Sequence, residues 1–481
     1  MVSRLKSIPL SIFCISFIYY CLLSSKVYTW LFVSGDSGDW LTASSMWIVP
    51  QPYGSPLYIL SGHFLNLFPG DLVIKMTIIL SCLPAAVTVT LVYLITKHLT
   101  NNKNIAVISS AILLGAGVFL TQATVLEQYS LAAMFVALAY YFYLKDKKWL
   151  TALSLGLGSA NHILVIPIAL LWFFLERKNW RSWAKTIPLY LAVGMLPYIL
   201  ILWLMTLDTP PFLAGNGLSL QAINSYLGST SVFGSLSIYD FPRRALDFVM
   251  LILMSFGLGI VPLWLAFKKP WAMHTKLLII AIAFPIWYYL TCLDPTTWTF
   301  MTYSCPFIAV AIGIGLTKVK VRYVVKGVVV SALVLIIVNS AALNADMLAK
   351  AEPQATECYN ELMSLPDGSA VVTHRGGFES MAMMYVISKG KDIVPVYFHS
   401  DDYEVDVLYG YYLDYAGDNY GLNGINTQTM VKDALDKGID VYILIPLMDK
   451  WKPAFATEYA GLEHYRLVTG VDLGYEVAQK D

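Results

Sequence analysis

Long apolar runs separated by short polar connections dominate the first 344 residues. A membrane-spanning helix needs roughly 20 apolar residues, so each run of about that length predicts a span. The runs lie near residues 8–33, 71–96, 105–122, 129–144, 184–206, 244–267, 274–292, 299–317 and 323–344. The first run is too long for the core of a signal peptide, and we interpret it as a retained transmembrane helix.

The stretch 149–176 has 28 residues, too many for one ordinary span and too few for two full ones. Basic residues flank it on both sides: Lys145, Lys147 and Lys148 before it, and Arg177, Lys178 and Arg181 after it. The positive-inside rule places both clusters on the same face of the membrane. We therefore predict a hairpin of two short helices, broken around residues 158–162, and eleven spans in total with the amino terminus inside and the carboxy terminus outside.

The distribution of charge supports this topology. Eighteen of the 22 basic residues between 1 and 344 fall in connections assigned to the cytoplasm, whereas eight of the ten acidic residues lie at or near the outer face. Two outer connections are long, at residues 34–70 and 207–242. Within the first, residues 40–48 form a short amphipathic piece, and residues 57–68 are too short to span and are expected to lie along the membrane surface.

Residues 345–481 have a different pattern, with 22 acidic and 10 basic side chains. Strand patterns at 369–373, 393–398 and 440–445 alternate with helical patterns near 379–389 and 428–437. Such alternation predicts a small α/β domain with a mainly parallel sheet. The chain thus divides into a transmembrane domain, residues 1–344, and a soluble extracytoplasmic domain, residues 345–481.

The composition excludes several classes of protein. Of the 481 residues, 57% are hydrophobic and only 13% are charged, about half the charged fraction of a soluble domain. The polar parts form no basic face of the kind that binds nucleic acid. Five of the six cysteines lie in the apolar body, which argues against a disulfide framework and most zinc sites.

The strongest chemical signal is the sequence GDSGDW, residues 35–40, immediately outside the first span. Its two carboxylates, Asp36 and Asp39, can serve as a general base and as an orienting or metal-binding partner. The alternative is that either aspartate caps the following helix. Because no helical pattern directly follows Asp36, we favour a catalytic role for that residue.

The order of these segments resembles the multi-spanning glycosyltransferases of the GT-C fold, and within them the protein O-mannosyltransferase-like branch. The resemblance is carried by the acidic loop GDSGD, by PYGSPLY at residues 52–58 and by LEQYSL at residues 126–131. It covers residues 1–145 well and returns in the tail at LPDGSAVVTHRGG and KDIVPV. The family fold implies that Asp36 is the base toward the acceptor nucleophile.

This chain departs from the family pattern at several positions. Asp39 stands where a glutamate is usual, Gln51 replaces a histidine, and Tyr53 and Ser55 replace a proline and a tyrosine. The resemblance also implies that Glu127, Tyr129 and Tyr58 line the cavity. An equal alternative to the cavity role of Glu127 is that it stands at a helix amino terminus, where an acidic side chain is favoured.

A reaction on a lipid-linked sugar phosphate also needs a cation for the departing phosphate. Arg243 and Arg244 begin a span from the outer side and suit a bidentate phosphate contact, although interfacial anchoring is the alternative for each. His162 and Asn161, in the predicted break of the hairpin, are candidates for a proton relay or a phosphate contact, with a structural role as the alternative.

The sequence therefore predicts an inverting membrane glycosyltransferase that moves a monosaccharide from a polyprenyl-phosphate donor to a protein or glycan acceptor outside the cytoplasm. The expected membrane is the plasma membrane of a prokaryote or the endoplasmic reticulum of a eukaryote. No cofactor is firmly implied; a divalent cation would fall to Asp36 and Asp39. The alternatives are a transporter or flippase of lipid-linked sugars and a non-catalytic glycan assembly protein.

Overall fold

The computed structural model describes most of the helical body and part of the tail. The described residues are 2–25, 36–46, 55–208, 240–267, 273–291, 295–345, 349, 356, 359–360, 362–374, 386, 389–398, 441–444, 465–469 and 475–480. Several predictions fall outside them, namely the end of the first span, residues 209–239 of the loop 207–242, most of the helix near 379–389 and the helix near 428–437.

The described residues between 2 and 343 are mostly helical. The first half contains α1 (Val2–Leu23), α2 (Asp36–Met46), α3 (Pro56–Asn66), α4 (Leu72–Met76), η1 (Thr77–Cys82), α5 (Leu83–Thr100), α6 (Lys103–Leu114), α7 (Gly117–Thr124), α8 (Tyr129–Leu144) and α9 (Lys148–Asn161). The second half contains α10 (Val165–Leu175), η2 (Glu176–Asn179), α11 (Trp180–Ala184), α12 (Ile187–Asp208), α15 (Asp240–Phe256), η3 (Gly257–Gly259), α16 (Ile260–Ala266), α17 (Met273–Thr291), η4 (Pro295–Tyr303), α18 (Cys305–Leu316) and α19 (Arg322–Leu343).

Helix length alone accounts for fewer spans than the sequence predicts. Within the described residues, three continuous helices are long and apolar enough to cross a membrane, and five if two sharply bent pairs each count as one span. One bend interrupts the predicted run 105–122, where α6 and α7 meet at 65°. The other, where residues 165–184 meet residues 187–201 at 98°, lies after the predicted hairpin, at the start of the predicted run 184–206. Four further apolar helices have 10–17 residues. The count of eleven stays a prediction.

The bend between α6 and α7 has a polar support inside the body. The side-chain amide of Asn339 donates to the carbonyl of Gly115 at 2.7 Å and to that of Met254 at 2.9 Å. Ser255 Oγ accepts from the amide of Val118 at 3.3 Å. Broken backbone at membrane depth is tolerated where neighbouring helices satisfy its polar groups, so α15 and α19 stabilise the break in the predicted span 105–122.

The two helices of the predicted hairpin at 149–176 are present, but residues 158–161 belong to α9 and the break follows them. Helices α9 and α10 are separated by residues 162–164. Lys148 Nζ at the start of α9 donates to Ser182 Oγ at 2.8 Å, although a straight helix of that length would hold these residues roughly 50 Å apart. The chain therefore turns back, and both basic flanks lie at the same end of the helical body, as the positive-inside argument required.

A buried carboxylate closes the base of this hairpin. Glu176, 3% exposed, accepts hydrogen bonds from Tyr143 Oη at 2.7 Å, Trp183 Nε1 at 2.9 Å and Asn179 Nδ2 at 3.2 Å. The replacement Glu176→Gln turns one of these acceptors into a donor. We expect it to destabilise the fold by about 1–3 kcal/mol, measured by thermal unfolding in detergent. The exposed Asp146→Asn is the matched control, and equal melting of both variants would contradict this account.

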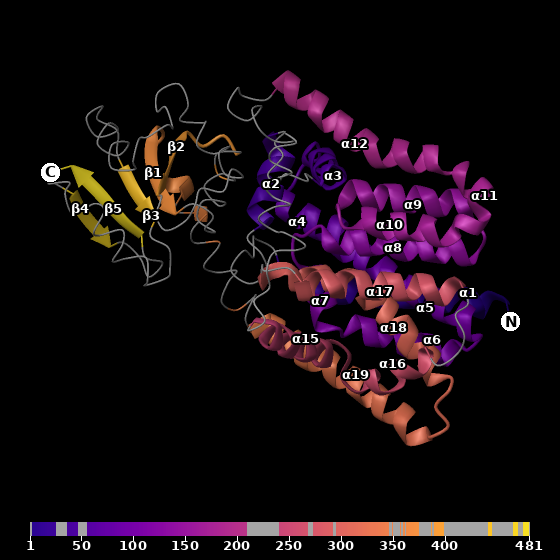
Figure 1. Cartoon of the computed structure of the whole chain (residues 1–481). Coiled ribbons are helices and arrows are strands. Elements are labelled where there is room, and N and C mark those ends of the chain that lie inside the picture. The colour runs from indigo at the N-terminus through magenta and orange to yellow at the C-terminus, as the bar shows by residue number, and fades with distance from the viewer. Residues whose placement is uncertain are drawn as a thin grey trace.

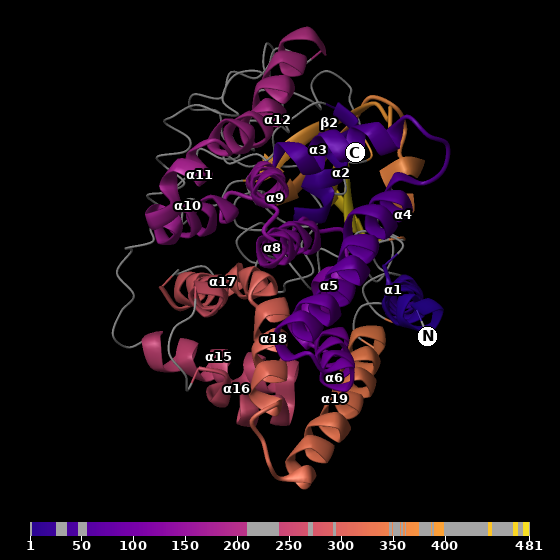
Figure 2. The same ribbon diagram turned by 90° about the vertical axis from the view of Figure 1, so that its right-hand side faces the viewer.

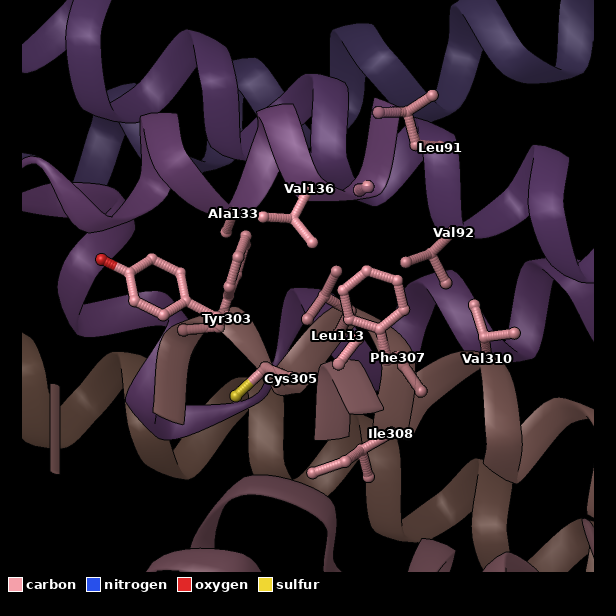
Figure 3. Packing of buried hydrophobic residues seen from close by; sticks show 14 of the residues in the cluster. Leu91, Val92, Leu113, Ala133, Val136, Tyr303, Cys305, Phe307, Ile308 and Val310 are labelled. Carbon is pink, nitrogen blue, oxygen red and sulfur yellow. The ribbon is translucent and has the colours of Figure 1, made fainter. Parts of the chain in front are cut away.

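The apolar core lies where α5, α6, α8 and α18 meet. Figure 3 shows Val92 of α5 and Val136 of α8 pointing toward Phe307 of α18, with Val310 of the same helix nearby. All are buried. Because these helices come from distant parts of the chain, their contact fixes the frame on which the connecting segments are placed.

The two ends of the helical body differ. Figure 1 shows α2, α3 and α4 at the end that faces the strands, and α11 and the amino terminus at the opposite end. Figure 2 views the body from that opposite end, with α9 and α8 between α10 on one side and α5 on the other. The helices of the first long outer connection, residues 34–70, therefore lie at the end of the body that faces the tail.

The tail contains five strands, β1 (Ser369–His374), β2 (Ile393–Phe398), β3 (Val441–Leu444), β4 (Tyr465–Thr469) and β5 (Tyr475–Lys480). They form one sheet in the order β2-β1-β3-β5-β4. The three strand segments read from the sequence are β1, β2 and β3, and they pair in parallel. The sheet is mixed rather than mainly parallel, because β5 pairs antiparallel with both β3 and β4.

Candidate active site at the corner between α7 and α8

Helix α2 carries the two aspartates of the GDSGDW sequence. The expectation that no helix directly follows Asp36 is wrong, because α2 begins at that residue. Asp39 is the fourth residue of α2, which excludes it as the cap that precedes the helix. Positions 36 and 39 are one turn apart, so they lie on the same side of α2. Their side chains lie outside the described part of the structure.

Two hydrogen bonds attach α2 to the corner formed by residues 125–128. Ser37 Oγ donates to the carbonyl of Leu126 at 3.2 Å, and Trp40 Nε1 donates to Glu127 Oε2 at 3.4 Å. Ser37 and Glu127 are 2% and 0% exposed. Since Ser37 adjoins Asp36 in the chain, these bonds hold the backbone of Asp36 beside the LEQYSL segment. Two of the three sequence motifs that carried the resemblance thus meet in space.

Helices α3 and η1 complete the surroundings of Glu127. The rings of Tyr58 and Trp40 lie 5.6 Å apart in an edge-to-face arrangement. Burial and the carboxylate of Glu127 raise the pKa of the Tyr58 phenol, against a weaker opposing effect of Ser81. Tyr58 is therefore a neutral hydrogen-bond donor at physiological pH. Ser81 Oγ donates to the Glu127 carbonyl at 3.2 Å, which fixes the corner to η1.

Gln128 of LEQYSL is hydrogen-bonded both to the PYGSPLY segment and to the hairpin. Its side-chain oxygen accepts from Ser55 Oγ, and its backbone carbonyl accepts from Asn161 Nδ2 at 2.9 Å. All three residues are fully buried. Ser55 has a φ of 40°, a left-handed conformation uncommon for a serine, directly before Pro56 of α3. The hydrogen bonds to Gln128 thus connect PYGSPLY, LEQYSL and the hairpin break in one network.

His162 lies in a cluster of aromatic rings next to this network. The ring centroids of Tyr129, Phe300 and Tyr303 each lie 5.4–5.5 Å from the ring centroid of His162. The ring of Tyr129 also lies 5.6 Å from that of Phe300 and 6.1 Å from that of Tyr303. His162 Nδ1 accepts from the amide of Leu164 at 3.2 Å. The neutral ring therefore carries its proton on Nε2. The cluster joins the hairpin break to η4.

Of the two arginine candidates for the phosphate, the structure describes the side chain of Arg244 alone. Arg244 lies 5.6 Å from the ring centroid of Tyr289 in α17, a cation–π contact at the start of α15. The side chain of Arg243 and the whole of Gln51 lie outside the described residues. Lys75 donates to the carbonyl of Phe68, across the turn that joins α3 and α4. Thus Glu127, Tyr129, Tyr58, Asn161 and His162 come together, whereas Arg244 is placed at a separate helix pair.

Sequence reasoning missed Gln128, Trp40 and Ser81. Gln128 and Trp40 are part of LEQYSL and GDSGDW, so their place in the motifs was a usable signal. Ser81 is a single serine in an apolar run, and only tertiary contact reveals its role. Within the described chain, no group of three or more His, Cys, Asp and Glu side chains is close enough to hold a metal ion; the carboxylates of Asp36 and Asp39 are not part of that description.

The arrangement of helices and sheet is similar to that of the solved structures of ArnT. The crystal structure of ArnT from Cupriavidus metallidurans bound to undecaprenyl phosphate matches with a TM-score of 0.66 at 11% identity, over 98% of this chain and 97% of that one. The apo structure of the same protein matches with a TM-score of 0.66 at 9% identity, over 99% and 98%. Arabinofuranosyltransferase AftD from Mycobacteria matches more weakly, with a TM-score of 0.39 at 12% identity over 75% of this chain and 29% of that one. The fold is that of a GT-C membrane protein.

Comparison of the sequence with protein families gives a more specific similarity than the fold does. Residues 36–183 match the family model of the protein O-mannosyl-transferase TMEM260 N-terminal domain. That range begins at Asp36 and includes the corner and the hairpin, so the resemblance read from the motifs is confirmed. Among curated proteins, no relative matches this sequence. Together with the apolar helices, these similarities support an integral membrane glycosyltransferase of the GT-C type.

Proposed function

We propose that this protein transfers a monosaccharide from a polyprenyl-phosphate donor to a protein or glycan acceptor outside the cytoplasm. One observation carries the proposal: the helix that begins at Asp36 is hydrogen-bonded to the buried Glu127 corner. The match of residues 36–183 to an O-mannosyl-transferase domain supports the reaction class. The ArnT structure with undecaprenyl phosphate supports the donor class.

In the proposed reaction, Asp36 accepts the proton of the acceptor hydroxyl as its oxygen attacks the anomeric carbon of the sugar. The bond between that carbon and the phosphate oxygen breaks, and polyprenyl phosphate leaves with the electron pair. Attack opposite the leaving group inverts the anomeric centre. Asp39, one helical turn further on, would orient the acceptor or hold a divalent cation; the hydrogen-bonded corner holds both positions in place.

The departing phosphate needs a positive charge, and we assign it to Arg243 or Arg244 at the start of α15. Arg244→Ala or Arg243→Ala, whichever residue is responsible, should weaken donor binding by about 1.5–3 kcal/mol because a charge-assisted hydrogen bond is lost. The other replacement should be nearly silent. Binding of a polyprenyl-phosphate sugar measures this, with Arg322→Ala at the start of α19 as the control. If both single variants bind the donor normally, the phosphate is held elsewhere, with Lys75 or His162 as the next candidates.

We further propose that residues 345–481 form an extracytoplasmic domain that covers the outer end of the cavity and handles acceptors. Electrostatic effects between tail and body support this. Burial raises the pKa of Tyr359, and the Asp71 carboxylate raises it further. Burial lowers the pKa of Lys389, with Asp71 opposing and Lys75 adding to the shift. Tyr359 and Lys389 of the tail are therefore near Asp71, in the turn between α3 and α4.

The proposed topology has eleven spans, with the basic hairpin base in the cytoplasm and the α3–α4 turn outside. A cysteine introduced at the exposed Asn66 should react with an impermeant maleimide in intact cells, and one at the exposed Lys178 should react only after the membrane is opened. The wild-type chain provides the background of native cysteines. Labelling of position 178 in intact cells would contradict the topology.

The activity itself is tested by incubating purified protein with a panel of polyprenyl-phosphate sugars. We expect consumption of one donor, with release of polyprenyl phosphate in proportion to the sugar transferred. Movement of an intact donor across vesicles without its consumption would instead indicate a flippase. Binding without consumption, in the presence of extracts that contain acceptors, would indicate an assembly protein.

A further inference from the structure

A second polar site lies at the base of the hairpin, at the end of the helical body opposite the sheet (Figure 1). It is a cavity of about 300 Å³ between the start of α9 and the connection from α11 to α12. Its lining is Asp146, Lys147, Lys148, Trp149, Leu150, Ser182, Lys185 and Thr186. None of these residues takes part in the proposed transfer reaction.

The charge of this cavity favours an anion. Three lysines line it against a single carboxylate, that of Asp146, which is 3.9 Å from Lys148 Nζ. Lys148 also donates to Ser182 at 2.8 Å, which places one ammonium and one hydroxyl side by side. An adjoining cavity of about 370 Å³ has the opposite balance, with Asp146 and Glu176 against Lys148. An anion would therefore bind in the first cavity.

The apolar surroundings indicate that the anion is attached to a lipid. Trp149 and Leu150 line the cavity and are themselves 56% and 39% exposed. Beside them, Trp180 of α11 is 61% exposed, and α12 begins with exposed apolar side chains at Ile187 and Leu191. Exposed tryptophan next to lysine is typical of the boundary between headgroups and acyl chains. A soluble anion would gain nothing from this apolar flank.

We propose that this cavity binds the phosphate of an anionic phospholipid headgroup, with Lys147 and Lys185 as its cationic contacts and the acyl chains along α9 and α12. Lys148 is held by Ser182 and Asp146 and frames the site. Basic pockets between transmembrane helices are suited to such headgroups. A bound lipid would tie the two arms of the hairpin together at their open end.

The test uses the purified, delipidated full chain in neutral detergent and follows thermal unfolding during titration with dioleoyl phosphatidylglycerol. We expect a saturable rise in melting temperature that dioleoyl phosphatidylcholine does not give. The double variant Lys147→Gln/Lys185→Gln should need about 10- to 30-fold more phosphatidylglycerol for the same rise, since each lysine near the surface contributes about a factor of five. Lys103→Gln/Lys320→Gln makes the same charge change at exposed positions outside the cavity and should behave as wild type.

Three outcomes would overturn the proposal. The first is equal titration of the cavity variant and the matched control, which would mean unspecific attraction. The second is an effect of phosphatidylcholine as large as that of phosphatidylglycerol. The third is a full effect of free glycerol 1-phosphate at the same concentration, which would mean a site for a soluble phosphate. If the double variant does not fold, Lys147→Gln alone is titrated, with an expected loss of about fivefold.

Discussion

Asp36→Asn is expected to lower sugar transfer by about 10²- to 10⁴-fold while the protein stays folded and binds its donor. The amide has the shape of the carboxylate but cannot accept the proton of the acceptor hydroxyl. Position 36 begins α2, and asparagine is as well tolerated as aspartate near a helix start, so the fold should not change. Transfer is measured as sugar incorporated per minute at saturating donor, and folding by the melting temperature.

Asp71→Asn is the matched control for this variant. Asp71 caps α4 through hydrogen bonds from the amides of Val73 at 2.7 Å and Ile74 at 3.2 Å, and asparagine can make the same cap. The control removes one negative charge near the same end of the body but should keep transfer within about twofold, because an exposed charge contributes little at ordinary salt. Near-normal turnover of Asp36→Asn would show that the base is another residue.

Asp39→Asn separates the two roles considered for Asp39. If Asp39 orients the acceptor, its loss should be milder than that of Asp36 and chelators should have no effect. If it holds a divalent cation with Asp36, its loss should be equally severe and chelators should abolish transfer. Measuring both variants with and without a chelator therefore decides between the roles.

The sequence predicted the positions of most helices because the apolar runs are long. It could not predict that the run 105–122 is broken, since the break depends on the amide of Asn339, more than 200 residues away, bonding to Gly115. The hairpin was predictable because both of its flanks are basic, and basic flanks favour the same side of the membrane whatever the tertiary contacts are. Strands β4 and β5 were missed because charged residues interrupt their apolar pattern, Arg466 in β4 and Glu476 and Lys480 in β5.

The site was predictable to the extent that its residues lie in motifs. Glu127, Tyr129, Tyr58, Asn161 and His162 were identified from the sequence and lie together in the structure, although their roles are still predictions. The contacts that unite them depend on Ser37, Ser55 and Gln128, whose polar groups bond to residues from 33 to 89 positions away. No local pattern records such distant partners. The helical start at Asp36 was missed for a related reason: glycine and serine in GDSGD resemble a loop, and tertiary contacts to the corner stabilise the helix instead.

Glu127→Ala is expected to lower the turnover of the folded enzyme by about 10²-fold. Glu127 is fully buried and accepts the indole hydrogen bond of Trp40, which holds α2 and therefore Asp36 in place. A shift of about 1 Å in a catalytic group can cost that much in rate. The variant should also lose about 2–4 kcal/mol of stability, because it leaves a cavity and an unbonded indole nitrogen. Turnover and the Michaelis constant for the acceptor should be measured below the melting temperature.

Two comparisons show whether Glu127 acts by positioning α2. Glu127→Gln keeps an oxygen acceptor for Trp40 and should recover most of the turnover, whereas Glu176→Ala removes a buried glutamate at the other end of the body and should lower stability without lowering the turnover of the folded protein. If Glu127→Gln is as inactive as Glu127→Ala while remaining folded, the carboxylate charge itself is required. Glu127 would then act in the cavity on substrate, the role implied by the resemblance to the O-mannosyltransferase-like branch, and its hydrogen bond to Trp40 would be secondary.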